Sequence, residues 1–470
     1  MANLAITQEK HSVFESLKEA IRGSHQDFTE GSVSRAIFLL ATPMVLEMLM
    51  ESLFSIVNVF WVTRLGSDAV ATVGLTESML SMVFAVAVGV SMSATAMVAR
   101  RIGEKDPRGA AVAGGQAILL GVGCALLMGL PGFLLAPKLL EWMGGSPQLI
   151  AAGWKYTAIT FGANIVVLLL FLNNAIFRGV GDASVAMRVL WMSNLINLVI
   201  DPCLIFGLGP FPELGITGAA VSTLVGRSFG VAYQFWMLTS GKARVTLRAS
   251  DFRIVPDVIV ALIRVSVTGV LQFAIAHSSW IALVRMISTF GSVAVAGYTI
   301  GIRIFIFVIL PCWGLSGAAA TMVGQNLGAK KPERAEKAVW LTALYNALFL
   351  ALIAVSFIFW PEALVGFFTS EPAEMAYAVD CLRIVGYGNV AYAFGMVMVQ
   401  AFNGAGDTVT PTLINLIGFW VLEIPIAYVL AFQLNWGVRG VFASIPIAEV
   451  FITLMGLFMF LRGTWKTRTI

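Results

Sequence analysis

Two carboxylates lie inside one of the apolar stretches of this chain. Glu47 and Glu51 fall within residues 41–61, which read ATPMVLEMLMESLFSIVNVFW, and the amide of Asn58 follows them. At 100° per residue, Glu51 lies about 40° and Asn58 about 20° around the helix axis from Glu47, so all three share one stripe. An acid in the middle of an apolar span is costly and usually serves an ion or proton site. The spacing therefore predicts a site for a cation or a proton.

The helix that carries these side chains has a weak point one turn before Glu47. Pro43 has no backbone N–H, so it cannot complete the hydrogen bond to the carbonyl of Leu39. We expect Pro43 to form a helix bend, through which ion binding at the two glutamates could move the helix.

A second polar set lies in the stretch NLINLVIDP. Asn194, Asn197 and Asp201 occupy positions i, i+3 and i+7, which fall on one helical face. Carboxylate and carboxamide oxygens suit a hard monovalent cation or a shared proton, whereas a transition metal would favour His or Cys. An alternative interpretation is that Asp201 and Pro202 merely end a helix near the outer surface.

Two further side chains are candidates for the same site. Glu77, in LTESM, is predicted to be a partner of Glu51, and Thr223, in GAAVST, could offer a hydroxyl.

The second half of the chain has its own polar residues within apolar segments. Glu423 in VLEIP and Glu449 in IAEV are acids that could form a second polar site, while Arg227 and Arg303 are intramembrane bases. Internal ion pairs between such acids and bases would explain them as well as a function does. Both interpretations remain open from the residues alone.

The whole chain has the composition of a polytopic membrane protein. Of its 470 residues, 58% are hydrophobic and only 12% are charged, far below the charge of soluble proteins. Twelve apolar segments are each long enough to span a bilayer: 34–62, 69–99, 110–137, 148–177, 183–207, 215–239, 256–288, 292–325, 335–367, 373–402, 408–433 and 437–461. The sequence predicts an all-α integral membrane protein of twelve transmembrane helices.

The basic residues indicate how the chain is oriented. If the N-terminus is cytoplasmic, most of the 30 lysines and arginines fall in cytoplasmic segments, as the positive-inside rule requires. We therefore expect both termini in the cytoplasm and the protein in a bacterial cytoplasmic (inner) membrane.

An internal repeat divides the chain into two halves. SMSATAMVARRIGEKDP, ending at Pro107, corresponds to SGAAATMVGQNLGAKKP, ending at Pro332, and the same offset of 225 residues pairs RGVGD with NGAGD. Each copy holds six segments, an even number, so the repeat is parallel, with an axis along the membrane normal. We expect two six-helix bundles around a central cleft, at 34–239 and 256–462, with an N-terminal segment 1–33, a linker 240–255 and a tail 463–470.

The repeat also shows which residues the halves do not share. At the same offset, Glu47 becomes Gln272, Glu51 becomes Ala276, and Asn58 becomes Leu283. Because scaffold residues agree while this ionisable set does not, the set is predicted to serve chemistry rather than architecture.

These features together resemble the multidrug and toxic compound extrusion (MATE) family, from about residue 34 to 462. The resemblance rests on RLGSDAVATVGL, on MVARRIGEKDP with MVGQNLGAKKP, on FRGVGD with FNGAGD, and on NLVIDP followed by GITGAA. It implies two V-shaped bundles, export of organic cations or amphiphiles in exchange for Na⁺ or H⁺, and a cation site at Asn58, Asn197, Asp201 and Thr223. The sequence departs from the family at Val57-Asn58-Val59, where the family usually has Val-Asp-Thr, and Glu51 could substitute for the missing acid.

Several functions are disfavoured by the motifs that the chain lacks. There is no GxxxxGK[ST] sequence for an ATP-driven pump, and no HExxH or GxSxG motif for a membrane enzyme. The favoured prediction is a monomeric antiporter for amphiphilic or cationic small molecules in the lipid bilayer, with no cofactor beyond the coupling ion and no nucleic-acid partner. A flippase for lipid-linked precursors of the same superfamily is the alternative, and an integral-membrane lipid-modifying enzyme is a more distant one.

Overall fold

The computed structural model describes residues 13–23 and 26–468 of the chain, and these residues form helices and connecting loops. The first half contains α1 (Val13–Arg22), α2 (Val33–Thr63), α3 (Ser67–Gly103), α4 (Pro107–Leu134), α5 (Ala136–Trp142), α6 (Pro147–Gly162), α7 (Asn164–Val180), α8 (Ala183–Phe206) and α9 (Ile216–Thr239). The second half begins after a short 3₁₀ turn, η1 (Ala249–Phe252). It contains α10 (Pro256–Ser288), α11 (Ser292–Gly328), α12 (Pro332–Phe359), α13 (Pro361–Val365), α14 (Pro372–Gly386), α15 (Asn389–Gly404), α16 (Val409–Asn415), the π-helix η2 (Leu416–Glu423), α17 (Ile424–Tyr428), the π-helix η3 (Val429–Gln433), α18 (Val438–Leu461) and the 3₁₀ turn η4 (Thr464–Thr467).

Among the described residues, ten continuous helical segments are long and apolar enough to cross a membrane. The number is eleven if the bent pair α14 and α15 is counted as one more span. In this count α6 and α7 form one span, and α16 to η3 form another. The remaining segment that we expected to span is α9, which is 24 residues long and packs against α8 and α6. Its composition includes Ser222, Arg227 and Gln234, which contact other helices of the first bundle and lower its mean hydropathy. The all-helical membrane fold is confirmed.

Two of the predicted continuous spans are interrupted. The segment predicted at 148–177 is divided at Ala163 into α6 and α7. The segment predicted at 373–402 is divided into α14 and α15, which meet at an angle of 60°. Glycines lie at both breaks, Gly162 at the first and Gly386 and Gly388 at the second, and sharp helix bends commonly occur at such residues.

The repeat is visible in the helix boundaries. α3 and α11 begin and end 225 residues apart, at Ser67 and Ser292 and at Gly103 and Gly328. α4 and α12 keep the same offset and begin at the paired prolines Pro107 and Pro332. Proline suits the first helical position because its missing N–H would have no intrahelical partner there. The conserved offsets confirm that the protein consists of two repeated halves.

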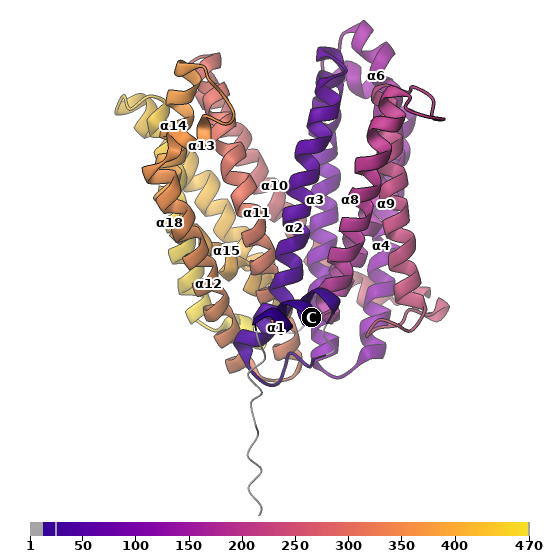
Figure 1. Cartoon of the computed structure of the whole chain (residues 1–470). Coiled ribbons are helices and arrows are strands. Elements are labelled where there is room, and N and C mark those ends of the chain that lie inside the picture. The colour runs from indigo at the N-terminus through magenta and orange to yellow at the C-terminus, as the bar shows by residue number, and fades with distance from the viewer. Residues whose placement is uncertain (1–12, 24–25, 469–470) are drawn as a thin grey trace, which may run out of the picture.

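The two bundles lie side by side and contact each other at one end (Figure 1). There α3 and α11 approach so closely that a Cβ on Gly103 would lie 1.9 Å from the Gln325 carbonyl oxygen, and one on Gly328 would lie 2.2 Å from the Arg100 carbonyl oxygen. Only glycine permits this backbone approach. We call this the closed end; α1 and the C-terminal residues also lie there, and the ribbons diverge towards the other end (Figure 1).

Three apolar clusters of buried side chains hold this arrangement together. One lies within the first bundle around Ile176 and Phe177, and another lies within the second bundle around Phe402 and Phe460. A third joins the bundles at the closed end, where Phe28, Ile37 and Met44 pack with Ala318 and Met322 of α11.

Candidate functional site

α2 carries Glu47 into the interior of the first bundle. Its side chain is almost fully buried, and Asn174 of α7 donates a hydrogen bond of 3.1 Å to Oε1. The guanidinium of Arg178, near the end of the same helix, lies 3.5 Å from this oxygen. The second carboxylate oxygen, Oε2, is buried without a hydrogen-bond partner among the described residues. Glu47 is therefore partly neutralised but has an oxygen left for another ligand.

Glu51, one turn further along α2, faces two other helices of the first bundle. Asn194 of α8 donates a hydrogen bond of 3.4 Å to Oε2, and the Arg227 guanidinium of α9 lies 3.7 Å from Oε1. The side chains of Glu51 and Arg227 are 33% and 12% exposed. Arg227 Nε is buried and has no partner among the described residues. Arg227 thus pairs with Glu51 of the first half and not with the second-half acids Glu423 and Glu449, and this ion pair joins α2 to α9.

Asp201 and Asn197 form the most deeply buried part of this polar region. The Ser222 hydroxyl of α9 donates a hydrogen bond to Asp201 Oδ1, while Oδ2 is buried without a partner among the described residues. Asn197 is fully buried, and both atoms of its amide lack a described partner. Buried polar atoms are rarely left unsatisfied unless a water, ion or ligand completes their hydrogen bonding. The two oxygens, Asp201 Oδ2 and Asn197 Oδ1, are therefore candidate ligands for a bound cation, while the Asn197 amide nitrogen can only donate a hydrogen bond.

α8 continues through Asp201 and Pro202 without interruption. The helix does not end at Pro202 but continues to Phe206, where Gly207 caps it in the left-handed conformation. The interpretation that Asp201 and Pro202 merely end a helix is therefore wrong. A Cβ on Gly226 of α9 would lie 2.7 Å from Asn197 Oδ1, so a glycine is needed where α9 passes this amide.

Three predicted residues lie outside these contacts. Thr223 is half-buried, and the hydroxyl that bonds Asp201 belongs to its neighbour Ser222, because 100° of helix rotation separates the two side chains. Glu77 is exposed and interacts electrostatically with Arg303 of α11, in the opposite bundle, rather than with Glu51. Asn58 is half-buried, and its side chain takes part in none of the side-chain hydrogen bonds found for residues 13–23 and 26–468.

Pro43 lies within α2, which stays helical from Val33 to Thr63. The residues before and around it pack on the second bundle: Ile37 and Met44 join α11, and the Met44 carbonyl oxygen would lie 2.6 Å from a Cβ on Gly314. From Glu47 onward the side chains contact α7, α8 and α9 of the first bundle. Pro43 thus precedes the point where α2 changes its packing partner, and a bend there remains a prediction.

One functional feature was missed at the level of sequence. Gln234 of α9 donates a hydrogen bond of 2.7 Å to Asn174 Oδ1, and Asn173 donates one of 3.1 Å to Gln234 Oε1. These buried amides hold the Asn174 side chain that bonds Glu47. The pair of asparagines in the apolar run FLNNAIF of α7 could have indicated this network of buried amides from the sequence.

The second half holds a smaller polar site. Glu423 is 4% exposed, and the Ser279 hydroxyl of α10 donates a hydrogen bond of 2.7 Å to its Oε2. Glu449 of α18 is also buried and interacts electrostatically with Glu423. Glu423 is the last residue of the π-helix η2, and π-helical turns are often found at functional sites. Neither acid has an arginine partner among the described ion pairs.

The first-half site can therefore do one kind of chemistry. It offers carboxylate, carboxamide and hydroxyl oxygens at the junction of α2, α7, α8 and α9, with several buried atoms unsatisfied. Such a set can accept a proton or a hard monovalent cation. No group in it is arranged as a nucleophile with an activating base.

Comparison with known proteins identifies similar chains over almost the full length. A family model described as MatE matches residues 43–203 and again 270–429, so it covers more than half of the chain. The probable multidrug resistance protein NorM of Thermotoga maritima is 23% identical over 93% of this chain and 94% of its own length. The probable multidrug resistance protein YoeA of Bacillus subtilis is 25% identical, over 95% and 97%. A protein named FAD transporter from Shewanella oneidensis is 23% identical, over 90% and 93%.

Solved structures share the fold. One is described as an outward-facing conformation of a multidrug resistance MATE family transporter of the MOP superfamily. It matches with a TM-score of 0.87 and 23% identity, over 96% of this chain and 98% of that one. A MOP superfamily transporter from Pyrococcus furiosus, described as having reverse polarity of its binding pocket, matches with a TM-score of 0.87 and 23% identity, over 94% and 98%.

Proposed function

Because this chain belongs to the MATE family of multi-pass membrane transporters, we propose that it is a secondary active antiporter that exports organic cations or amphiphilic drugs in exchange for Na⁺ or H⁺. A MATE chain is a multidrug efflux transporter and not an enzyme. The nature of the cargo and of the coupling ion is the part that we propose.

The observation that supports ion coupling is the set of unsatisfied buried atoms in the first bundle. Asp201 Oδ2, Glu47 Oε2 and both amide atoms of Asn197 lie in the interior without described partners. A cation or proton bound at Glu47 Oε2 would act on α2, and one bound at Asp201 Oδ2 and Asn197 Oδ1 would act on α8 beside α9. Since α2 also packs on α11 at the closed end, ion binding can bias how the two bundles meet. Such a bias is what couples an ion to alternating access.

We place the closed end in the cytoplasm, because the basic residues gather in the segments that lie there. The conformation described is then closed to the cytoplasm. Substrate would be taken up in the opposite state, after the contacts of α3 and α11 around Gly103 and Gly328 have opened.

The test is efflux of fluorescent lipophilic cations from proteoliposomes under separately imposed Na⁺ and H⁺ gradients. We expect one gradient to drive efflux and its collapse to stop it. Absence of efflux from a broad panel of cationic dyes under both gradients would contradict the proposal, and would favour the flippase for lipid-linked precursors.

A second class of cargo is supported by the charges in the spans. Arg227 and Arg303 place two guanidinium groups among the acids: Arg227 forms an ion pair with Glu51, and Arg303 interacts electrostatically with Glu77. An amphiphile with an anionic group, of the kind implied by the relative named FAD transporter, could bind these donors. The same proteoliposomes should therefore be loaded in parallel with a flavin dinucleotide. Export of the dinucleotide but of no cationic dye would establish this second class.

A further inference from the structure

The segment 26–31, between α1 and α2, lies directly over the junction of the two bundles at the closed end. Its one large apolar side chain, Phe28, is 1% exposed and packs in the cluster that joins α2 to α11. A Cβ on Gly181 of the first bundle would lie 2.7 Å from the Phe28 ring, and the Arg244 guanidinium lies 5.3 Å over it. The segment is thus wedged between the halves rather than lying free on the surface.

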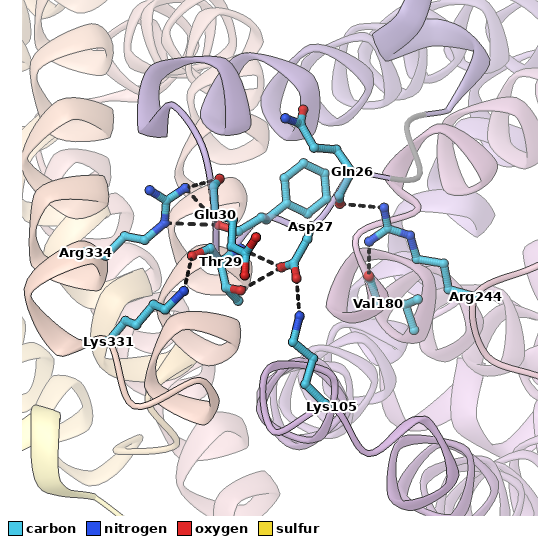
Figure 2. Close-up of polar contacts among 10 residues, drawn as sticks. Gln26, Asp27, Thr29, Glu30, Lys105, Val180, Arg244, Lys331 and Arg334 are labelled. Atoms are coloured by element: carbon cyan, nitrogen blue, oxygen red, sulfur yellow. Dashed lines mark hydrogen bonds and ion pairs between the residues drawn. The ribbon is translucent and has the colours of Figure 1, made fainter. Parts of the chain in front are cut away.

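The first bundle anchors one side of this segment. Asp27 accepts an ion-paired hydrogen bond from Lys105, in the loop that follows α3 (Figure 2). Arg244, in the linker after α9, donates a hydrogen bond of 2.6 Å to the Gln26 carbonyl and another to the Val180 carbonyl at the end of α7 (Figure 2). Burial raises the pKa of Asp27, but hydrogen bonds from Lys105 and Thr29 outweigh this effect and lower it to about 2. Asp27 is therefore charged throughout the physiological pH range, so its ion pair with Lys105 does not depend on pH within that range.

On the side of the second bundle, the hydrogen bonds to this segment that the structure describes go to its backbone carbonyls. Lys331 donates to the Thr29 carbonyl at 2.9 Å, and Arg334 of α12 donates to the Glu30 carbonyl at 2.7 Å (Figure 2). Arg334 also donates to the carbonyls of Phe28 and Gly31, the latter at 2.8 Å. Charged donors of this kind make stronger hydrogen bonds than neutral ones. The segment continues directly into α2 of the first bundle. Its contacts with Lys331 and Arg334 therefore connect the first bundle to the second.

We propose that residues 26–31 are a latch that holds the closed end shut, and that the latch must leave Lys331 and Arg334 before the closed end can open. The proposal concerns the conformational step of the transporter and rests on the proposed alternating access. The contacts of the segment with both bundles cannot all persist once the bundles separate. Releasing the latch removes several charge-assisted hydrogen bonds and the buried ring of Phe28, so the latch stabilises one state selectively. Such a selective contribution shifts the populations of the two states.

The test uses a cysteine-free full-length protein with a single reporter, Thr321→Cys. Thr321 is fully buried between the bundles near the closed end, where its hydroxyl donates a hydrogen bond of 3.1 Å to the Arg178 carbonyl. A membrane-impermeant maleimide is applied to inside-out vesicles, and the rate of labelling reports how often the closed end opens. The test variant is Lys331→Ala with Arg334→Ala, and the matched control is Lys337→Ala, which is exposed one turn further along α12.

We expect the double variant to raise the labelling rate by roughly fivefold or more, as for a shift between two states, and the control to leave it unchanged. Asp27→Asn, which weakens only the first anchor, should raise it by less. A labelling rate in the double variant equal to that of the control would overturn the latch. Because labelling needs neither substrate nor ion gradient, failure of efflux in the unmodified protein would contradict the antiporter while leaving this result to stand.

Discussion

At the scale of residues, the polar side chains of the spans fall into two kinds. Glu47 and Glu51 each have an arginine within 4 Å, whereas Asp201 and Glu423 are held only by a serine hydroxyl. An arginine partner fixes the position of an acid, while a single serine hydroxyl leaves an oxygen of the carboxylate for another ligand. The two kinds should therefore respond differently to substitution.

The first prediction concerns Glu51. We expect Glu51→Gln to abolish ion-driven efflux, with a loss of about tenfold or more, because the substitution removes the charge that Arg227 and the transported ion share. Glu47→Gln and Asp201→Asn should weaken efflux, and Glu423→Gln should matter less. The measurement is the initial efflux rate against imposed ΔpH and ΔpNa at matched expression, with the exposed Glu141→Gln as control. Unchanged coupling in Glu51→Gln together with a loss in Glu423→Gln would refute the assignment.

The second prediction separates two neighbouring hydroxyls. Ser222 bonds Asp201, and Thr223 does not. Ser222→Ala should therefore reduce the apparent affinity for the coupling ion several-fold, since one buried hydrogen bond is worth about 1 kcal/mol. Thr223→Ala should change it little. The dependence of efflux on ion concentration measures both variants, and the opposite ranking would restore the assignment to Thr223 that the family resemblance implies.

At the scale of elements, the contact of α3 with α11 decides which end of the molecule is shut. The two helices are equivalent in the repeat, so their contact is reciprocal: Gly103 lies against Gln325, and Gly328 lies against Arg100. Gln325 also donates a hydrogen bond of 2.9 Å to the Gly179 carbonyl across the bundles. A backbone contact of this kind leaves no room for adjustment, because packed helices are not continuously deformable.

The third prediction tests this contact. Gly103→Ala places a methyl group within 1.9 Å of the Gln325 carbonyl oxygen, so the helices must separate. We expect a loss of about 1–3 kcal/mol of stability for the conformation with the closed end shut, seen as a lower melting temperature. Gly74→Ala, in the same helix with nothing within 4 Å of its added carbon, should be neutral or slightly stabilising. Equal melting temperatures for the two variants would show that the contact is not tight in the membrane.

At the scale of the whole molecule, the arrangement of the halves defines two different ends. At one end α1, the segment 26–31 and the basic loops converge on the contact between the bundles; towards the other the bundles diverge (Figure 1). The end at which the bundles are in contact is therefore also the end at which the basic residues gather.

The fourth prediction fixes the orientation in the membrane. Cysteines introduced at Ser67 and Pro212 should react with an impermeant reagent in intact cells, because they lie away from the closed end. A cysteine at Ala329, next to Lys330 and Lys331, should react only after permeabilisation, since the positive-inside rule places this loop in the cytoplasm. The reverse pattern would invert the orientation and the assignment of the closed end.

The sequence by itself determined the features that depend on local composition and on duplication. The spans followed from apolar length, the paired prolines Pro107 and Pro332 marked equivalent helix starts, and the offset of 225 residues predicted two repeated halves. These signals are local or periodic, so they can be read without knowing which helices touch. The same holds for the stripe of Glu47 and Glu51, because a single helix fixes their relative direction.

Only the tertiary structure decided which partners these acids meet. The helix rotation of α9 brings Ser222 rather than Thr223 to Asp201, and Glu77 of α3 interacts electrostatically with Arg303 of the other bundle. Arg227 and Arg178 meet Glu51 and Glu47 across 176 and 131 residues of sequence, and residues 26–31 contact Lys331 and Arg334 about 300 residues away. Contacts between distant segments depend on the crossing and rotation of whole helices. No spacing within one segment contains that information.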